Sequence, residues 1–176
     1  LNLPAVPLAA VQGIALVAHP HPLQGGTLDN KVAQTLAKAF FALDYVAVRF
    51  TFRGLGASHG AFDQGVRETE DALGALAYAR AHYGASLPVA LAGFSFGSYV
   101  QTRVAKRFEA ERLVLVGPAV QRFALDAVPA DTIVVTACGW VSMAARKSPI
   151  SLFLLITLWA RNRPPGVTRG NTRSKN

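Results

Sequence analysis

Short, largely apolar runs recur along the first part of the chain, and segments of mixed polarity separate them. The runs are residues 14–18, 45–50, 87–92, 113–116 and 132–135. Continuous apolar runs of this length are typical of strands that are buried on both faces of a parallel sheet, whereas half-buried strands alternate polar with apolar residues. The pattern therefore predicts five buried strands.

The segments between the runs predict helices. After the first run, apolar residues recur as a helical stripe that includes Leu36 and Phe40, and Thr27 or Asp29 is expected to cap this helix. Residues 68–83 form a second predicted helix, with acidic residues in the first turn and basic residues near the end. Strands that alternate with helices indicate an α/β fold, with a predominantly parallel sheet and helices on both faces.

Three loops directly follow predicted strands: residues 19–27, residues 51–60 and the turn at residues 93–97. Binding sites in such sheets gather at the carboxyl ends of the strands, so we expect all three loops at one edge. The turn reads Gly93-Phe94-Ser95-Phe96-Gly97, a G-x-S-x-G motif. This motif is typical of a nucleophile elbow, in which a serine stands on a strained strand-to-helix turn. A plain tight turn made of small residues is the alternative.

These segments together resemble a known family. The stretches AHPHPLQGGTLDNKV, VRFTFRGLGASHG and LAGFSFGSYV occur in this order, and the chain resembles small bacterial dienelactone-hydrolase-like members of the α/β-hydrolase superfamily over roughly residues 14–135. The resemblance implies an α/β-hydrolase fold, incomplete at its C-terminal end, and a Ser-His-Asp triad that hydrolyses an ester, thioester or related acyl bond of a small molecule. It also implies that Ser95 is the nucleophile, and no cofactor is expected.

An oxyanion hole is expected beside this serine. One donor should be the backbone N–H of Phe96, the residue after the nucleophile, and the second should come from the loop after an earlier strand. Prolines have no N–H, so the amides that residues 19–23 offer next to prolines are those of His21 and Leu23. Analogy with the usual position favours His21. The alternative is that the prolines only stiffen the loop.

The triad cannot be completed from the sequence. In this fold the chain order is serine, acid, histidine, but no histidine follows His82 and no acid follows the run 132–135. The carboxylates after Ser95 are Glu109, Glu111, Asp126 and Asp131. The triad acid and base are therefore unassigned, and we expect an impaired hydrolase. The alternatives are recruitment of His19, His21 or His59 as the base, and a non-catalytic domain that binds a ligand or partner.

Other chemistry-bearing residues have simpler interpretations. His19 and His21 lie two apart, but no cluster of Cys, Asp or Glu nearby completes a metal site, so no metal is expected. A structural, hydrogen-bonded role is favoured for His19. Arg53 is expected to tie its loop to an acid such as Asp29 or Glu70, or to contact an anionic substrate.

The composition of the chain also indicates the compartment in which the protein is expected. The chain has one cysteine, Cys138, so a disulfide framework is excluded and a reducing, cytoplasmic location is favoured. Cys138 itself is expected to be buried. No signal peptide is visible, and the chain opens on Leu1, so we expect its true start upstream. The longest apolar run, residues 150–160, is shorter than the ~20 residues of a membrane span. It is expected to cover a sheet edge or to promote aggregation.

The net charge of +8 is concentrated in the last part of the chain. From Arg146 onward there are seven basic residues and no acidic one, which leaves 18 − 7 = 11 basic against 10 acidic residues before it. We therefore divide the chain into a core, residues 1–135, and an atypical basic segment, residues 136–176, partly disordered. A shifted reading frame or a chimeric gene end is the hypothesis for this segment. Among the alternative functions, binding of nucleic acid or membranes by this basic segment is the least favoured, so no specific nucleic acid is expected as a partner. The sequence does not indicate the oligomeric state.

Overall fold

The structure is a computed structural model that describes residues 10–56, 58–128 and 132–136. Cys138, the apolar run 150–160 and residues 137–176 of the basic segment lie outside the described residues, as does the expected incompleteness of the C-terminal end. The elements in chain order are β1 (Gly13–Ala18), the 3-10 helix η2 (Pro22–Gln24), α1 (Lys31–Phe41), β2 (Tyr45–Arg49), α2 (Val66–Tyr83), β3 (Val89–Phe94), α3 (Phe96–Arg107), β4 (Arg112–Val116) and β5 (Ile133–Val135).

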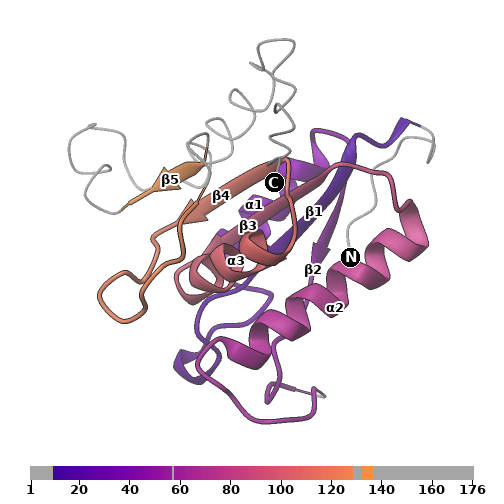
Figure 1. Cartoon of the computed structure of the whole chain (residues 1–176). Helices are drawn as coiled ribbons and strands as arrows, with labels where there is room; N and C mark the ends of the chain where they lie inside the picture. The colour runs from indigo at the N-terminus through magenta and orange to yellow at the C-terminus, as the bar shows by residue number, and fades with distance from the viewer. Residues whose placement is uncertain (1–9, 57, 129–131, 137–176) are drawn as a thin grey trace, which may run out of the picture.

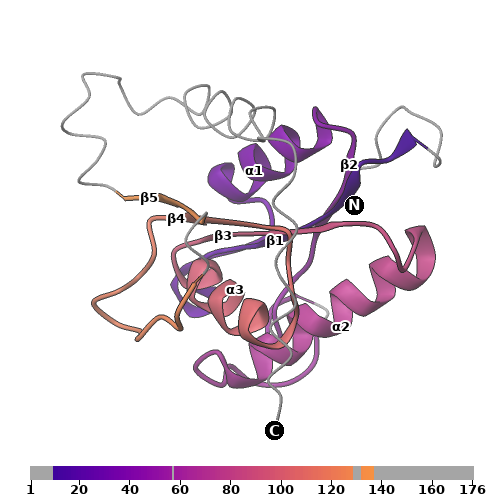
Figure 2. The same cartoon turned by 45° about the horizontal axis from the view of Figure 1, so that its top comes forward.

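The strands form one sheet in the order β2-β1-β3-β4-β5, and each neighbouring pair is parallel. Figures 1 and 2 show α1 on one face of the sheet and α2 with α3 on the other. The predicted α/β fold class is confirmed. All strands run in one direction, so the loops after β1, β2 and β3 lie at the same, carboxyl edge.

Both faces of the sheet are buried, each in its own core. In β1, Ile14 and Leu16 join the cluster under α2 and α3, whereas Ala15 and Val17 join the cluster under α1. Successive side chains of a strand point to opposite faces, so a strand covered on both sides needs apolar residues at every position. This explains why the strands appear in the sequence as continuous apolar runs.

Two helix starts differ from their predictions in detail. The cap of α1 is Asn30, whose side chain accepts the amides of Val32 and Ala33 at 2.9 and 3.4 Å. The prediction of Thr27 or Asp29 is wrong because these residues form the preceding turn, in which the Thr27 hydroxyl accepts the Asp29 amide. The helix predicted over residues 68–83 begins slightly earlier, at Val66.

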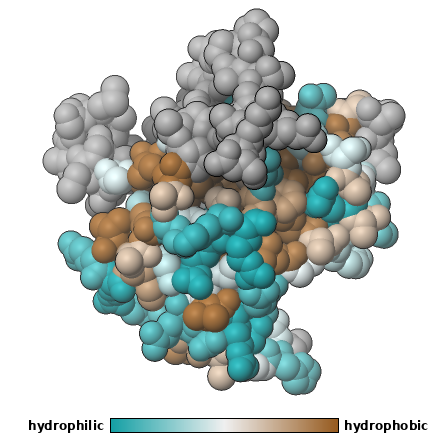
Figure 3. All heavy atoms as spheres, in the orientation of Figure 1, coloured by the Kyte–Doolittle hydropathy of each residue, from teal (hydrophilic) through white to brown (hydrophobic). Residues whose placement is uncertain are grey.

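On the face drawn in Figure 3, several hydrophobic groups are separated by hydrophilic residues. Large exposed apolar residues of this kind occur singly on most proteins. Those found are Leu23, Val66, Tyr78, Val120, Val128 and Val134. Within the described part of the chain, no helix combines the length and apolarity that crossing a membrane requires.

Candidate active site

The turn at residues 93–97, called the elbow below, carries the serine in a strained backbone conformation. Ser95 stands between the end of β3 and the start of α3 with φ 55° and ψ −113°. A positive φ is uncommon outside glycine and costs free energy, so it persists only where neighbours enforce it. Here the Ser95 amide donates to the Val116 carbonyl at 2.9 Å, and the Ser95 carbonyl accepts the Ser98 amide at 3.0 Å. The predicted strand-to-helix turn is confirmed.

The two glycines of the elbow leave no space for a side chain. A Cβ on Gly93 would lie 2.4 Å from the Gly97 carbonyl, and a Cβ on Gly97 would lie 2.4 Å from the Ala18 carbonyl. Real Cβ atoms do not approach backbone this closely, so the helix can pass β1 and β3 only with glycine at these positions. The motif is therefore required by close backbone packing as well as by the turn itself.

Buried polar side chains of α3 bind this helix to backbone carbonyls of the neighbouring strands, next to the serine. The Ser98 hydroxyl reaches the carbonyls of Gly93 and Val116 at 2.8 and 3.1 Å. The Gln101 amide donates to the carbonyls of Leu16 and Ala92 at 2.9 and 3.0 Å. Neither residue was predicted from the sequence. The sequence feature that could have indicated them is a pair of polar residues in the helix directly after an apolar strand. Polar side chains that are buried at such positions need hydrogen-bond partners.

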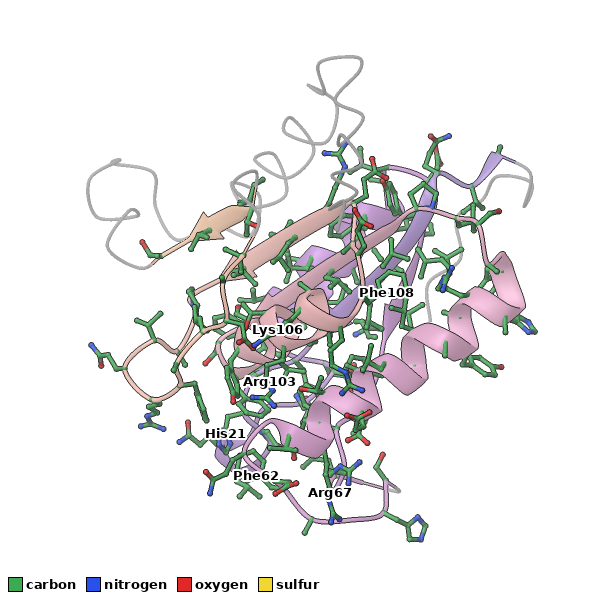
Figure 4. All side chains as sticks on the ribbon, viewed as in Figure 1. His21, Phe62, Arg67, Arg103, Lys106 and Phe108 are labelled. Carbon is green, nitrogen blue, oxygen red and sulfur yellow. The ribbon has the colours of Figure 1, made fainter. Side chains whose placement is uncertain are left out.

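The two predicted oxyanion donors lie on neighbouring segments. His21 is in the loop after β1 (residues 19–27, the β1 loop), and its carbonyl accepts the amides of Gln24 and Gly26 at 3.1 and 3.0 Å. Its ring packs against Phe96 with 5.1 Å between ring centroids, and against Phe62 with 4.6 Å (Figure 4). The β1 loop and the elbow are thus in contact. Among the described residues, neither the His21 amide nor the Phe96 amide donates a hydrogen bond.

The His21 side chain is half-buried within this aromatic group. Burial lowers its pKa, the Arg122 charge lowers it further and Glu68 partly offsets both. The ring is therefore favoured in its neutral form.

His19 has the structural role that was favoured for it. Its side chain is fully buried. Nδ1 lies 2.7 Å from the Pro20 carbonyl, and Nε2 accepts the Phe52 amide at 3.2 Å. Burial lowers the pKa of His19. Because both ring nitrogens are engaged, this side chain is not available as a base in the described conformation.

Arg53 is bound by an acid other than those expected. Its Nε and Nη2 donate to the Asp71 carboxylate at 3.0 and 2.6 Å, and its backbone amide donates to the same carboxylate at 3.0 Å. This hydrogen bonding raises the pKa of Arg53. The expected tie to Asp29 or Glu70 is wrong: Asp29 pairs with Arg49, and Glu70 pairs with Arg107 of α3.

The reason for the Arg53 partner lies in the phase of α2. Adjacent residues of a helix point about 100° apart, so Glu70 and Asp71 cannot both face the same neighbour. Glu70 faces α3, whereas Asp71 faces the loop after β2 (residues 51–60, the β2 loop). Arg53 therefore anchors the β2 loop to α2.

Among the described residues, none of the remaining histidines or of the carboxylates that follow Ser95 is paired with its hydroxyl. His82 is in the last turn of α2, at the edge where the strands begin, and His59 is exposed. Asp126 pairs with Lys106 at 3.1 Å beside α3, and Asp131 lies outside the described residues. Glu109 and Glu111 stand between α3 and the start of β4, again at the opposite edge from Ser95. Among the described residues there is no group of three or more His, Cys, Asp or Glu suited to a metal ion.

Similar proteins agree with this architecture. A family model, Hydrolase_4, described as serine aminopeptidase, S33, matches residues 23–166. An α/β serine hydrolase homologue from Coxiella burnetii superposes with a TM-score of 0.72 at 28% identity, over 89% of this chain and 88% of that chain. XC6422 from Xanthomonas campestris, described as an α/β serine hydrolase without lid, gives a TM-score of 0.76 at 30% identity, over 94% of this chain and 88% of that chain.

A curated relative is longer than this chain. An uncharacterized protein of Rickettsia prowazekii, RP471, is 37% identical over 120 residues, which are 68% of this chain and 47% of the relative. The chain thus spans about half the length of the curated relative it matches. The family match covers most of the chain, and the solved structures share its sheet and helices. The chain therefore belongs to the serine aminopeptidase S33 family of the α/β-hydrolase superfamily.

Proposed function

We propose that the chain is a serine hydrolase in which Ser95 attacks an ester, thioester or related acyl bond of a small molecule. The observation that carries the proposal is the backbone of Ser95, held at φ 55° between two glycines that admit no Cβ. Strain of this kind is concentrated at functional sites. A plain tight turn would need neither a strained serine nor so close an approach of helix and strand.

The proposed reaction follows from the position of the serine at the start of α3. Ser95 Oγ attacks the acyl carbon, and the carbonyl electron pair moves onto oxygen. The amides of Phe96 and His21 donate to this oxyanion, and the positive end of the α3 dipole favours the same charge. Collapse breaks the bond to the alkoxide or thiolate, which leaves as the alcohol or thiol by taking up, through solvent, the proton that the Ser95 hydroxyl lost. Water then adds to the acyl-enzyme, and the acid leaves as a proton returns to Ser95 Oγ. This chemistry requires no cofactor.

The supply of a base limits the rate of the proposed reaction. A serine hydroxyl is a poor nucleophile unless a base takes its proton. Both nitrogens of His19 are engaged, and no histidine follows Ser95 in the 176 residues. We therefore propose that this chain hydrolyses its substrate slowly. A serine protease without its triad still accelerates hydrolysis about 10³–10⁴-fold over water through its oxyanion hole and binding.

The first test is labelling with a fluorophosphonate, read by intact mass. We expect one adduct on the chain and on its Ser86→Ala variant, and none on Ser95→Ala. Ser86 is a matched control because it is exposed in the turn before β3, at the opposite edge of the sheet. A folded chain that takes up no label contradicts the proposal and favours the alternative, a non-catalytic domain that binds a small molecule. A cytoplasmic location stays a prediction from the sequence.

A further inference from the structure

The peptide unit between Pro20 and His21 links a side chain to the proposed oxyanion hole. A peptide unit is planar, and in the trans form its C=O and N–H point in opposite directions. No cis peptide occurs among the described residues. The direction of the His21 N–H is therefore fixed by whatever holds the Pro20 carbonyl. That group is the His19 imidazole, with Nδ1 at 2.7 Å from the Pro20 oxygen.

The hydrogen bonds of His19 identify its tautomer. The Phe52 amide can only donate, so Nε2, which it contacts at 3.2 Å, carries no proton. The Pro20 carbonyl can only accept, so Nδ1 carries the proton. A neutral ring with its proton on Nδ1 satisfies both partners, and the other tautomer satisfies neither. Full burial favours this neutral ring.

Two further restraints hold the same unit in place. A Cβ on Gly26 would lie 2.3 Å from the Pro20 oxygen, so the β1 loop folds closely over that carbonyl. On the other side, Phe52 is adjacent to Arg53, whose backbone and guanidinium both bind Asp71 of α2. The imidazole thus lies between a carbonyl that it orients and an amide that α2 keeps in position.

We propose that His19 is a positioning residue, which aims the His21 N–H at the oxyanion by holding the Pro20 carbonyl with Nδ1–H. The inference rests on the proposed function for its catalytic consequence. Its structural part, the tautomer and the bond, stands on the distances alone. A role limited to filling the core would be served by any ring or amide of similar size at position 19.

Two substitutions separate these roles because each keeps one of the two hydrogen bonds. In His19→Asn, the side-chain amide nitrogen lies close to the place of Nδ1 and donates to Pro20. In His19→Gln, the side-chain oxygen reaches the place of Nε2 and accepts from Phe52, but no donor faces Pro20. We expect His19→Gln to lower kcat for p-nitrophenyl acetate roughly 100-fold with little change in KM, as for a lost oxyanion donor. We expect His19→Asn to lose less than about 10-fold. A kcat of His19→Gln equal to that of the wild type would overturn the inference.

A second readout needs no activity. In ¹⁵N NMR spectra of the Ser95→Ala chain, His19 should show a protonated Nδ1 and an unprotonated Nε2. The His21 amide nitrogen should shift in His19→Gln and stay in place in His19→Asn, and thermal unfolding verifies that each variant is folded. A proton on Nε2 would overturn the inference even if Ser95 reacts. If the wild type takes up no fluorophosphonate but the tautomer is as inferred, the proposed function fails and the orientation of the peptide stands.

Discussion

The elbow and the β1 loop meet at the same edge of the sheet, yet different forces hold them. The elbow is fixed by backbone: two glycines without space for a Cβ, and a serine amide bonded to the end of β4. The β1 loop has backbone hydrogen bonds of its own, but it also depends on side chains: its His19 ring binds the Pro20 carbonyl and the Phe52 amide of the β2 loop, which Asp71 anchors. Backbone restraints are rigid and local. Side-chain restraints can be removed one at a time, and one of them can titrate.

Replacing Gly97 is expected to have the largest effect on stability, because it disturbs the close backbone packing that holds the elbow. The Cβ of Gly97→Ala would lie 2.4 Å from the Ala18 carbonyl and 2.6 Å from the His19 carbonyl, both in central backbone that cannot move away cheaply. We expect the free energy of unfolding, measured by urea denaturation, to fall by about 3 kcal/mol.

Gly74→Ala is the matched control for Gly97→Ala. Gly74 lies inside α2, and apart from the backbone of its own helix no atom lies within 4 Å of the place that a Cβ would take. Alanine favours helix over glycine, so this variant should gain roughly 0.5–1 kcal/mol. An equal and small effect of the two substitutions would mean that the elbow is not held by close packing.

Removing the anchor of the β2 loop should have an intermediate effect. Asp71→Asn removes the charge that Arg53 binds through three hydrogen bonds, and both side chains are largely buried. We expect a loss of about 1–2 kcal/mol in the free energy of unfolding. Glu70→Gln is the control: its ion pair with Arg107 is exposed, and such pairs contribute ~0–1 kcal/mol. Equal losses in the two variants would show that the loop does not depend on Asp71.

The smallest expected effect is a dependence of stability on pH through His19. Burial lowers its pKa from the ordinary value of 6.5. As pH falls below this value, His19 becomes protonated in the unfolded chain but stays neutral in the folded chain. Unfolding therefore becomes more favourable. The stabilisation is complete above the unfolded pKa and is lost as pH falls toward the folded pKa.

Urea denaturation from about pH 8 to about pH 5 measures this dependence. We expect the free energy of unfolding of the wild type to decline more than that of His19→Asn over this range. His21, whose pKa is also lowered, acts in the same direction and remains in both chains. Parallel declines would contradict a buried neutral His19.

The same contrast explains what could be predicted from the sequence. The strands, the fold class and the turn at Ser95 follow from local patterns, because burial on both faces and close backbone approach each select residues at consecutive positions. The structural role of His19 was also anticipated. Its partner Phe52 and the pairing of Arg53 with Asp71 were not, because these contacts join segments far apart in the chain, and helix phase decides which acid faces the loop.

The hydrogen bonds to Val116 have a consequence for the order in which the chain assembles. The Ser95 amide donates to this carbonyl, at the last residue of β4, and the Ser98 hydroxyl, which lies nearer the Gly93 carbonyl, is also within hydrogen-bond distance of it. Until β4 has left the ribosome and docked beside β3, these bonds are absent, and only the contacts within the elbow and with β1 hold the serine in its strained conformation. The strained backbone of Ser95 is therefore fully supported only when β4, which follows it in the chain, has joined the sheet.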